Sequence, residues 1–417
     1  MLSAQRDWLA DRTIDAAALL VRIDAHARIG AIEGGGVCRL ALTDADREGR
    51  DRLVAWMREA GLCVDVDAIG NVFGTRAGRH ALPPVMTGSH IDTVATGGRY
   101  DGNYGVLAGL EAVRWLDARG IATRRPIVIA AFTNEEGVRF QPDMMGSLVH
   151  AGGLSLEHAL DTIGTDGTRL GDELERIGYA GPMRCGTIVP HAFVELHIEQ
   201  GPVLEAEGRT IGAVADLQGI SWTELTIVGQ SNHAGTTPMR MRRDAGWCAA
   251  AVAVFVRDLA RRMGDGQVGT VGAIDLHPNL VNVIAARATV KVDLRNTDAA
   301  ALARAEAELD AFVARLEAEE GVRINARRLV RLDPVVFDPR LVRMIEASAA
   351  RRGLPTMRMT SGAGHDAQMM ARVCPSAMVF VPSAGGLSHN PREHTDAAEL
   401  AHGAAVLLDV LTALADE

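Results

Sequence analysis

The chain has 417 residues, and its 43 Lys and Arg against 53 Asp and Glu give a formal net charge of -10. Nucleic-acid binding needs a basic surface that neutralises phosphates, so this acidic balance favours a small-molecule partner. The five cysteines are scattered without a C-x-x-C pair, as is typical of a protein from a reducing cytoplasm. No window of 18 uncharged apolar residues occurs, so we expect neither export nor membrane insertion.

Strand-like apolar runs alternate with helical periodicity in the first block of the chain and again near its end. Short β-branched runs with amphipathic helices between them predict an α/β fold with a mostly parallel sheet covered by helices. In chain order, the clearest elements are the strand "PPVMTGSH" (83–90), a helix over about 105–116, and the strands "RPIVIAAFTNEE" (125–136), "AFVELHIEQG" (192–201) and "SAMVFVPSAGG" (376–386).

The segment from about 212 to 328 follows another pattern. A strand "GISWTELTIVG", a helix over about 243–262, two strands "QVGTVGAIDL" and "NVIAARATVKVDLRN", a helix over about 298–319 and a strand "VRINARRLVRL" succeed one another. This is the β-α-β-β-α-β order of ferredoxin-like domains. At 417 residues the chain is about two to three times the typical domain length. We therefore predict a larger domain of residues 1–211 and 329–417, interrupted by an inserted domain of residues 212–328.

Side chains that bind metals stand where the predicted strands end. His90 ends one apolar run, and the pair Glu135 and Glu136 follows another. Asp101 stands just before a predicted helix. In a doubly wound sheet such positions meet at the carboxyl edge, where ligands bind. Imidazole favours zinc and other late first-row divalent ions, and a carboxylate can bridge two ions, so this edge is a candidate metal site.

Two further histidines and the glutamate pair extend this prediction. His197 interrupts the apolar strand "VELHIEQG", and His394 lies in the terminal loop "SHNPREHTD". Metal-assisted hydrolysis needs one carboxylate that coordinates and another that takes a proton from the attacking water. The adjacent Glu135 and Glu136 provide such a pair.

Ordinary structural roles compete with each of these assignments. A single strand-end histidine is usually a hydrogen-bonded residue, Asp101 has the position of a helix N-cap, and a glutamate pair is commonly a solvated helix start. The unbroken apolar strand "IVIAAF" before the pair weakens the last alternative. The segment "SGAGHDA" (361–367) loosely matches a dinucleotide fingerprint, but no acidic residue ends the next strand. No G-x-S-x-G elbow indicates a serine nucleophile.

Seven motifs in order, between about residues 86 and 396, carry a resemblance to a known family. They are "GSHIDTV", "GGRYDGNYGVLAGLEA", "FTNEEGVRF", "ELHIEQGPVLE", "GQSNHAGTTPM", "NVIAARATVKVDLRN" and "SGAGHDA" with "SHNPREHT". The chain resembles the hydantoinase/carbamoylase branch of the M20 metallopeptidase-like amidohydrolases. That branch contains N-carbamoyl-L-amino-acid amidohydrolases, β-ureidopropionases and allantoate amidohydrolases. Broader M20 peptidases carry Asp where this chain has His197, which favours the amidohydrolase branch.

The resemblance implies a di-metal catalytic domain and a lid, residues 212–328, through which two subunits form a homodimer. It implies two divalent metal ions per subunit, with Zn²⁺ first and Mn²⁺, Co²⁺ or Ni²⁺ as the other candidates. Asp101 would bridge them, and Glu135 would be the general base. The implied ligands are His90, Asp101, Glu136, His197 and His394.

The resemblance also implies residues that contact the substrate. Gln200 would face it, and Gly364 would approach it because no Cβ intervenes. From the lid, His233 would stabilise the oxyanion, reaching the partner subunit's active site, although a polar turn in its own subunit is the simpler alternative. Asn282 and Arg295 would hold the substrate's α-carboxylate, since the planar fork of arginine suits bidentate binding.

The implied activity is cleavage of the ureido C–N bond of N-carbamoyl-L-amino acids to the amino acid, carbon dioxide and ammonia. Allantoate also carries a carboxylate and ureido groups, so an allantoate amidohydrolase remains open, as does a β-ureidopropionase. An M20 dipeptidase or a non-catalytic metal-binding protein is less favoured, because a pseudoenzyme would typically have lost Glu135 or a ligand. We expect a cytoplasmic enzyme with no nucleic-acid or membrane partner.

Overall fold

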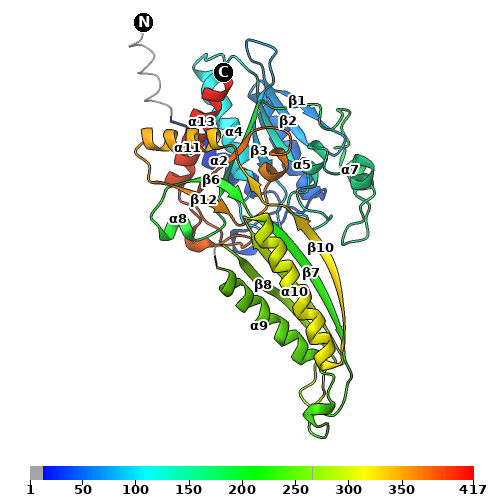
Figure 1. Cartoon of the computed structure of the whole chain (residues 1–417). Coiled ribbons are helices and arrows are strands. Elements are labelled where there is room, and N and C mark those ends of the chain that lie inside the picture. The colour runs from blue at the N-terminus through cyan, green and yellow to red at the C-terminus, as the bar shows by residue number, and fades with distance from the viewer. Residues whose placement is uncertain (1–12, 265) are drawn as a thin grey trace. The chain divides into compact units, whose positions relative to one another are not determined.

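A computed structural model describes residues 13–264 and 266–417 (Figure 1). The chain forms two compact units, Met1–Ala215 with Val336–Glu417, and Asp216–Val335. The predicted boundaries, 211/212 and 328/329, fall a few residues earlier. The difference arises because strand β6 (Ile211–Leu217) pairs with a strand of the first unit, whereas β10 (Arg323–Leu332) continues the sheet of the second.

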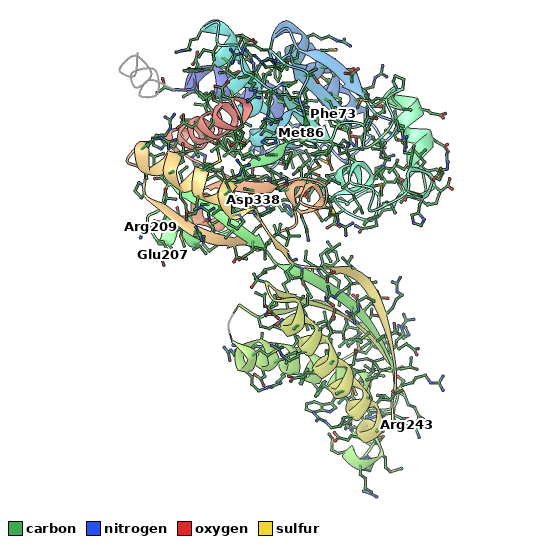
Figure 2. All side chains as sticks on the ribbon, turned by 45° about the horizontal axis from the view of Figure 1, so that its top comes forward. Phe73, Met86, Glu207, Arg209, Arg243 and Asp338 are labelled. Atoms are coloured by element: carbon green, nitrogen blue, oxygen red, sulfur yellow. The ribbon has the colours of Figure 1, made fainter. Side chains whose placement is uncertain are left out.

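The first unit is a mixed α/β fold with a parallel sheet at its centre. Strands β4 (Ile127–Phe132), β3 (Val85–His90), β5 (Ala192–Ile198) and β13 (Ser376–Val381) lie side by side in this order, each parallel to its neighbour. Every residue of these strands is buried, as expected for parallel strands with both faces covered. Phe73 and Met86, labelled in Figure 2, belong to this fully buried core.

Antiparallel pairing extends the central strands on both sides. On one side β2 (Val72–Arg76) pairs with β4, and β1 (Cys63–Val66) pairs with β2. On the other side β6 pairs antiparallel with β13, followed by β11 (Val335–Val336), while β12 (Thr356–Ser361) also pairs with β6. The sheet is therefore mixed, with its parallel strands in the middle.

Helices α4 (Asn103–Ala118) and α13 (Ala397–Ala415) pack on the central strands, with α2 (Ala16–Ala27) and α11 (Pro339–Arg351) beside them. Helices α5 (Met145–His150) and α12 (Asp366–Met370) contact each other and the strands β4 and β5, respectively, while α3 (Asp44–Glu59) contacts β1 and β2. The shorter elements are α6 (Leu156–Leu160), α7 (Leu170–Ile177), α8 (Val203–Ala206) and the single turns η1 (Glu33–Gly35), η2 (Met239–Met241) and η3 (Ala384–Gly386).

Helix α13 is long and apolar enough to cross a membrane by length and composition, with a mean hydropathy of 1.5 over its best window. However, 67% of that window is buried inside the protein. Its contacts with α4, α11 and β13 are those of a core helix, which meets the same criteria.

The second unit has the element order β7 (Gly219–Val228), α9 (Ala245–Met263), β8 (Val268–His277), β9 (Arg287–Asn296), α10 (Ala299–Glu320) and β10. Its strands form an antiparallel sheet in the order β10-β7-β9-β8. Alternate residues of β7 and β9, such as Leu225 and Val292, join the core with α9 and α10. Asp244 and Asp298 cap the two helices by accepting backbone N–H groups of the first turn. The predicted β-α-β-β-α-β order is thus the observed order.

Candidate metal centre

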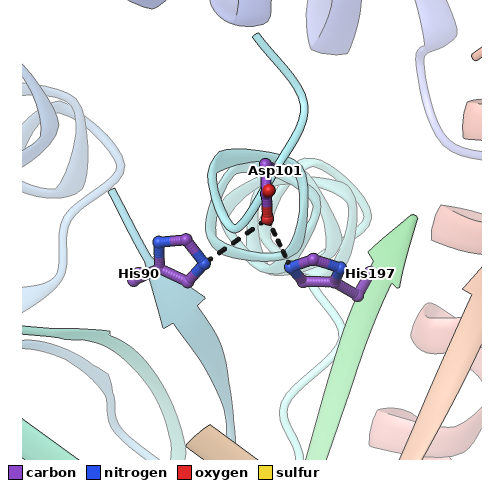
Figure 3. A group of neighbouring side chains, drawn as sticks. All are labelled: His90, Asp101 and His197. Carbon is purple, nitrogen blue, oxygen red and sulfur yellow. Dashed lines mark ion pairs between the residues drawn. The ribbon is translucent and has the colours of Figure 1, made fainter. Parts of the chain in front are cut away.

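His90, Asp101 and His197 meet at the carboxyl edge of the parallel strands (Figure 3). His90 is the last residue of β3, and His197 is the penultimate residue of β5. Oδ1 of Asp101 lies 3.6 Å from Nε2 of His90 and 3.1 Å from Nε2 of His197. All three side chains are buried. Parallel strands end at the same edge, so residues that are far apart in sequence form one ligand group.

Backbone carbonyl groups orient both imidazole rings. Nδ1 of His90 donates to the carbonyl of Asp92 (2.9 Å), and Nδ1 of His197 donates to the carbonyl of Ile198 (2.8 Å). A carbonyl oxygen only accepts, so each Nδ1 carries a proton and each Nε2 is turned toward Asp101. Metal-binding histidines typically have this arrangement, in which the second ring nitrogen donates to a carbonyl or carboxylate.

Asp101 is not the N-cap of α4, although its position before the helix suggested that role. The N-cap is Gly102, which makes no side-chain cap, and the Asp101 carboxylate faces the histidines instead. Gly102 has a φ of 62°, and a Cβ there would lie 2.4 Å from Nε2 of His90. Only glycine fits at this position, because both the backbone conformation and the space exclude a side chain.

A second group consists of Asp101, Glu136 and His389. Nε2 of His389 lies 3.4 Å from Oδ2 of Asp101 and 3.4 Å from Oε2 of Glu136. The Asp101 carboxylate therefore presents Oδ1 to one ligand group and Oδ2 to the other. This is the arrangement of a carboxylate that bridges two metal ions.

His394 does not lie in this cluster, so the prediction of His394 as a ligand is corrected to His389. The His394 side chain is 57% exposed, and its Nε2 lies 3.2 Å from Oδ1 of Asp396. Both histidines belong to the loop "SHNPREHT", and the spacing of sequence motifs alone cannot show which of them turns inward. The loop conformation decides this: His389 adopts a φ of 54°, and its Nε2 lies 3.4 Å from Oδ2 of Asp101.

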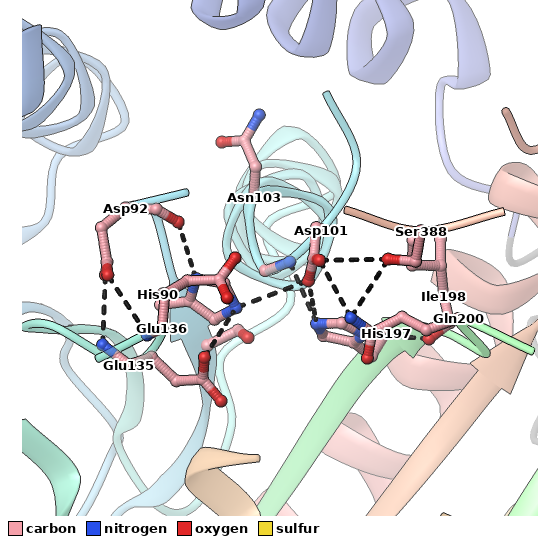
Figure 4. Close-up of polar contacts among 12 residues, drawn as sticks. His90, Asp92, Asp101, Asn103, Glu135, Glu136, His197, Ile198, Gln200 and Ser388 are labelled. Atoms are coloured by element: carbon pink, nitrogen blue, oxygen red, sulfur yellow. Dashed lines mark hydrogen bonds and ion pairs between the residues drawn. The ribbon is translucent and has the colours of Figure 1, made fainter. Parts of the chain in front are cut away.

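Glu135 and Glu136 lie in the loop after β4 and do not begin a helix. The Asp92 carboxylate accepts both of their backbone N–H groups at 3.3 Å, which holds this loop against the end of β3 (Figure 4). Oε2 of Glu135 lies 3.5 Å from Nε2 of His90, while Oε1 of Glu136 accepts the N–H of Val94 (3.2 Å). Glu135 is thus beside the ligand groups but outside both of them.

Burial shifts the pKa values of the acidic side chains in the cluster. Burial raises the pKa of Glu136 to about 8, and the neighbouring Asp101 adds to the rise. Burial also raises the pKa of Glu135 well above its usual range. For Asp101, burial acts in the same direction, but hydrogen bonds with His197, His389 and His90 hold its pKa well below its usual range. Buried charges of this kind are normally paired or coordinate metal, and the imidazole and carboxylate donors fit divalent cations.

Strained backbone surrounds the cluster. Asn134, Gln200 and His389 are non-glycine residues with φ values of 56°, 59° and 54°. Asn134 precedes Glu135 and Gln200 lies three residues after His197. His389 belongs to the second ligand group. Such conformations are unfavourable for side chains with a Cβ and are concentrated at functional sites.

Gln200 contacts the carboxylate of Asp101. Its Nε2 donates to Oδ2 of Asp101 (2.9 Å) and to Oγ of Ser388 (3.2 Å), and its Oε1 is buried with no hydrogen-bond partner among the described residues. Gly364 instead lies against Met144, whose Cε would be 2.9 Å from an added Cβ. The substrate contacts of Gln200 and Gly364 remain predictions.

A third group of potential ligands, Glu195, His197 and His365, was not identified from the sequence. Its Glu195 is already engaged by hydrogen bonds, because its carboxylate accepts from Oγ of Ser89 (2.6 Å) and from the N–H of Ala367 (2.7 Å). The latter bond joins β5 to the start of α12. We therefore interpret this group as structural support beneath His197.

The second unit contains the remaining predicted residues. His233 is exposed, and its Nδ1 accepts the backbone N–H groups of Gly235 (3.0 Å) and Thr236 (3.3 Å). Asn282 is also exposed and lies beside this segment, since its carbonyl accepts the N–H of Ala234 (2.9 Å). His233 and Asn282 are therefore neighbours within one chain.

Arg295 lies at the other end of the same sheet. Asn282 belongs to the loop that joins the end of β8 to the start of β9 at Arg287, whereas Arg295 is the penultimate residue of β9. Eight residues of strand at about 3.3 Å each separate Arg287 from Arg295 by roughly 26 Å. Arg243, labelled in Figure 2, marks the end that carries His233, because its carbonyl accepts the N–H of Gln230 (2.8 Å). A small molecule cannot contact both ends in one chain.

Comparison with known proteins agrees with this geometry. Residues 86–413 match the model of peptidase family M20/M25/M40. The chain is 43% identical over 415 residues to the N-carbamoyl-L-amino-acid amidohydrolase of Rhizobium meliloti, covering 97% of this chain and 98% of the relative. It is 36% identical to the allantoate amidohydrolase of Escherichia coli K12, covering 93% and 95%.

A solved structure shows the same fold over nearly the whole chain. The hydantoinase/carbamoylase family amidase from Burkholderia multivorans superposes with a TM-score of 0.92 at 47% identity, covering 97% of this chain and 99% of that chain. With this coverage and identity, the chain belongs to peptidase family M20/M25/M40 and, within it, to the hydantoinase/carbamoylase family of amidases.

Proposed function

We propose that this chain is a metal-dependent amidohydrolase that cleaves the ureido C–N bond of an N-carbamoyl-L-amino acid. The products are the amino acid, carbon dioxide and ammonia. The observation that carries the proposal is the pair of ligand groups that share Asp101, with the uncoordinated carboxylate of Glu135 beside them. The relative from Rhizobium meliloti, whose name states this activity, supports the choice of substrate.

His90, Asp101 and His197 would hold one divalent cation, and Asp101, Glu136 and His389 the other. Zn²⁺ is the first candidate, and Mn²⁺, Co²⁺ and Ni²⁺ are the others, because mixed imidazole and carboxylate sites accept all four. When bound, such ions polarise a carbonyl group and lower the pKa of water.

Glu135 serves as the general base. Glu135 is 7% exposed, so its side chain is largely shielded from bulk water. Its Oε2 lies 3.5 Å from Nε2 of His90, so the carboxylate stands beside the ligand groups, where a general base takes a proton from water and delivers it to the leaving nitrogen. Asp92 fixes the backbone of this residue, which keeps the carboxylate beside His90.

His233 is suited to stabilise the oxyanion. Its Nδ1 accepts two backbone N–H groups, so in the neutral ring the proton resides on Nε2, which becomes a hydrogen-bond donor. Arg295 supplies the guanidinium for the substrate carboxylate. Its Nη2 now lies 2.8 Å from Oδ2 of Asp293, a carboxylate contact of the kind that the substrate would replace.

Two subunits complete the substrate site. His233 and Asn282 lie near the end of the sheet where β9 starts at Arg287, and Arg295 lies roughly 26 Å from Arg287 along that strand, so we assign Arg295 to one subunit and His233 with Asn282 to its partner. Strand β8 is a ten-residue edge strand with Ile274 and Leu276 exposed. Exposed apolar edge strands are sites of pairing with another chain, so the homodimer forms through the second unit, which acts as the lid.

Allantoate amidohydrolase activity is the second candidate. The relative from Escherichia coli supports it, and allantoate carries the same carboxylate and ureido chemistry. A β-ureidopropionase would bind a longer carbamoyl β-amino acid at the same groups, whereas a dipeptidase or a non-catalytic protein is less favoured. The cytoplasm remains the proposed location of the enzyme.

A substrate panel tests the proposal. Metal-free protein, prepared with a chelator and checked by elemental analysis, is reconstituted with each divalent ion. Hydrolysis is then measured for N-carbamoyl-L-amino acids, N-carbamoyl-β-alanine, allantoate and dipeptides. We expect no activity without metal and the highest kcat/KM for an N-carbamoyl-L-amino acid. Full activity of the metal-free protein would refute the metal-dependent mechanism, and a preference for allantoate would select the second candidate.

A further inference from the structure

The buried carboxylate of Glu393 contacts the turn that carries Asp101. Oε1 of Glu393 accepts the backbone N–H of Tyr100 (3.0 Å) and that of Asp101 (3.3 Å). Oε2 lies 3.2 Å from Oγ of Ser388, which is itself 3.3 Å from Oδ2 of Asp101. Glu393 is 5% exposed and lies almost 300 residues from this turn in sequence. One side chain thus holds the backbone of the bridging residue and, through Ser388, approaches its carboxylate.

Gly98 makes room for this contact. The three atoms nearest to a Cβ built on Gly98 all belong to Glu393, with Oε1 at 2.0 Å. Gly98 does not have a positive φ, so alanine can adopt its backbone conformation. The need for glycine at residue 98 therefore comes from the Glu393 side chain and not from the turn itself.

Glu393 also follows His389 in the same loop, four residues later. By holding Asp101 from this loop, Glu393 links two members of the second ligand group, whose Nε2 and Oδ2 atoms are 3.4 Å apart. His394, the neighbour of Glu393, is exposed and makes no contact with the cluster among those described. Glu393 is thus the residue of the "REHT" segment that reaches the site.

We propose that Glu393 is a positioning residue that sets the orientation of the Asp101 carboxylate between the two metal ions. This inference rests on the proposed di-metal site. Without the Glu393 carboxylate, two N–H groups in the buried turn lose their acceptor, and Asp101 is free to rotate away from one ligand group. The consequence is weaker binding of the second ion, with substrate binding little affected.

The test measures metal binding separately from activity. Mn²⁺ is titrated into metal-free protein, and paramagnetic resonance reports whether two bound ions are magnetically coupled through a shared carboxylate. We expect E393A to lower both the affinity for the second ion and kcat by about 10- to 100-fold, the range for partners that support metal ligands, and to lose the coupled signal. KM should change little.

Three variants distinguish positioning from a general loss of structure. E393Q keeps a carbonyl acceptor for both N–H groups and a donor for Ser388, so it should retain the coupled signal. G98A should reproduce E393A, because its Cβ displaces the Glu393 carboxylate. In an E393A background, G98A should have a smaller effect than in wild type, since the clash with the Glu393 carboxylate is gone and only the Cβ of residue 393, at 2.4 Å, remains in the way.

Asp338 provides the matched control. Its carboxylate accepts the N–H groups of Arg340 (2.7 Å) and Leu341 (3.2 Å) at the start of α11, away from both ligand groups. D338A should lower the melting temperature and leave Mn²⁺ binding unchanged. Figure 2 labels this residue.

The outcomes separate the inference from the proposed function. Wild-type protein that binds no metal would overturn both. Wild-type protein with two coupled ions and a folded E393A protein with the same affinities and signal would overturn the inference alone. If E393A does not fold, G98A decides: normal coupling in G98A would overturn the role of Glu393. If E393Q impairs metal binding as much as E393A does, acceptance of the two N–H groups is not what positions Asp101, and the inference is overturned.

Discussion

A test by subunit complementation follows from the separation of His233 and Arg295, which lie at opposite ends of the sheet of the second unit. If each active site takes Glu135 from one subunit and His233 from the other, two inactive variants should restore activity when mixed. In a mixed dimer of Glu135→Ala and His233→Ala, the His233→Ala subunit keeps its Glu135 and receives His233 from its partner. That site is intact, whereas the other site lacks both residues.

The expected magnitude comes from the two-fold symmetry of the dimer. With random exchange of equal amounts, about half of the dimers are mixed and each has one working site of two, so activity should reach about a quarter of the wild-type value. The parent variants should each retain at most about 1% of wild-type turnover, given the usual size of general-base and oxyanion contributions. The activity of the mixture should therefore be far above that of either parent variant.

The assay follows ammonia release after the two variants have exchanged subunits, with exchange confirmed by mass spectrometry of differently tagged chains. Glu135→Ala mixed with Arg295→Ala is the matched control. Arg295 lies at the other end of the sheet from His233 and is assigned to the same site as Glu135, so mixing should add no activity beyond that of the two parent variants. No recovery with His233→Ala despite confirmed exchange would refute the action of His233 across the dimer. Recovery with Arg295→Ala would reverse the assignment.

Three other predictions concern single residues. Glu135→Gln should keep both metal ions and lose at least about 100-fold in kcat, because the proton carrier is gone; loss of metal instead would show that the two glutamates were assigned in the wrong order. His389→Ala should bind one ion less than wild type, whereas His394→Ala should bind both, as measured by elemental analysis; the opposite pattern would restore His394 as the ligand. Arg295→Lys should raise KM by about 10-fold or more with a smaller effect on kcat, because a point charge cannot reproduce a bidentate contact. An unchanged KM would place the substrate carboxylate elsewhere.

Much of the fold could be predicted from the sequence because its central strands are unambiguous. The apolar runs ending at His90 and Phe132 appear as β3 and β4, and the β-α-β-β-α-β order of the second unit is observed. The strands β1, β2 and β12, outside the parallel centre of the sheet, were not identified. These strands are short, and β1 and β12 are only partly buried. Local hydrophobic patterns therefore do not distinguish them from loops.

Most of the candidate site was also accessible from motifs. His90, Asp101, Glu136 and His197 come together in the structure, with Glu135 beside His90. His394 was the exception, because two histidines five residues apart in one loop have equal standing as sequence motifs. The supporting contacts of Asp92 and Glu393 were missed, since both carboxylates accept backbone N–H groups. Every residue except proline has such a group, so no residue type in the sequence marks the partner.

The sequence by itself determined the chemistry of this protein: the imidazole and carboxylate donors, the strand ends that carry them and the inserted domain that separates them from the last ligand loop. These features depend on residue types and on local periodicity, which are properties of short segments. The tertiary structure decided which histidine turns inward, how the two oxygens of Asp101 divide between two ligand groups, and that His233 and Arg295 occupy opposite ends of one sheet. Such choices depend on contacts between segments hundreds of residues apart, and those contacts exist only once the sheet has aligned the strand ends.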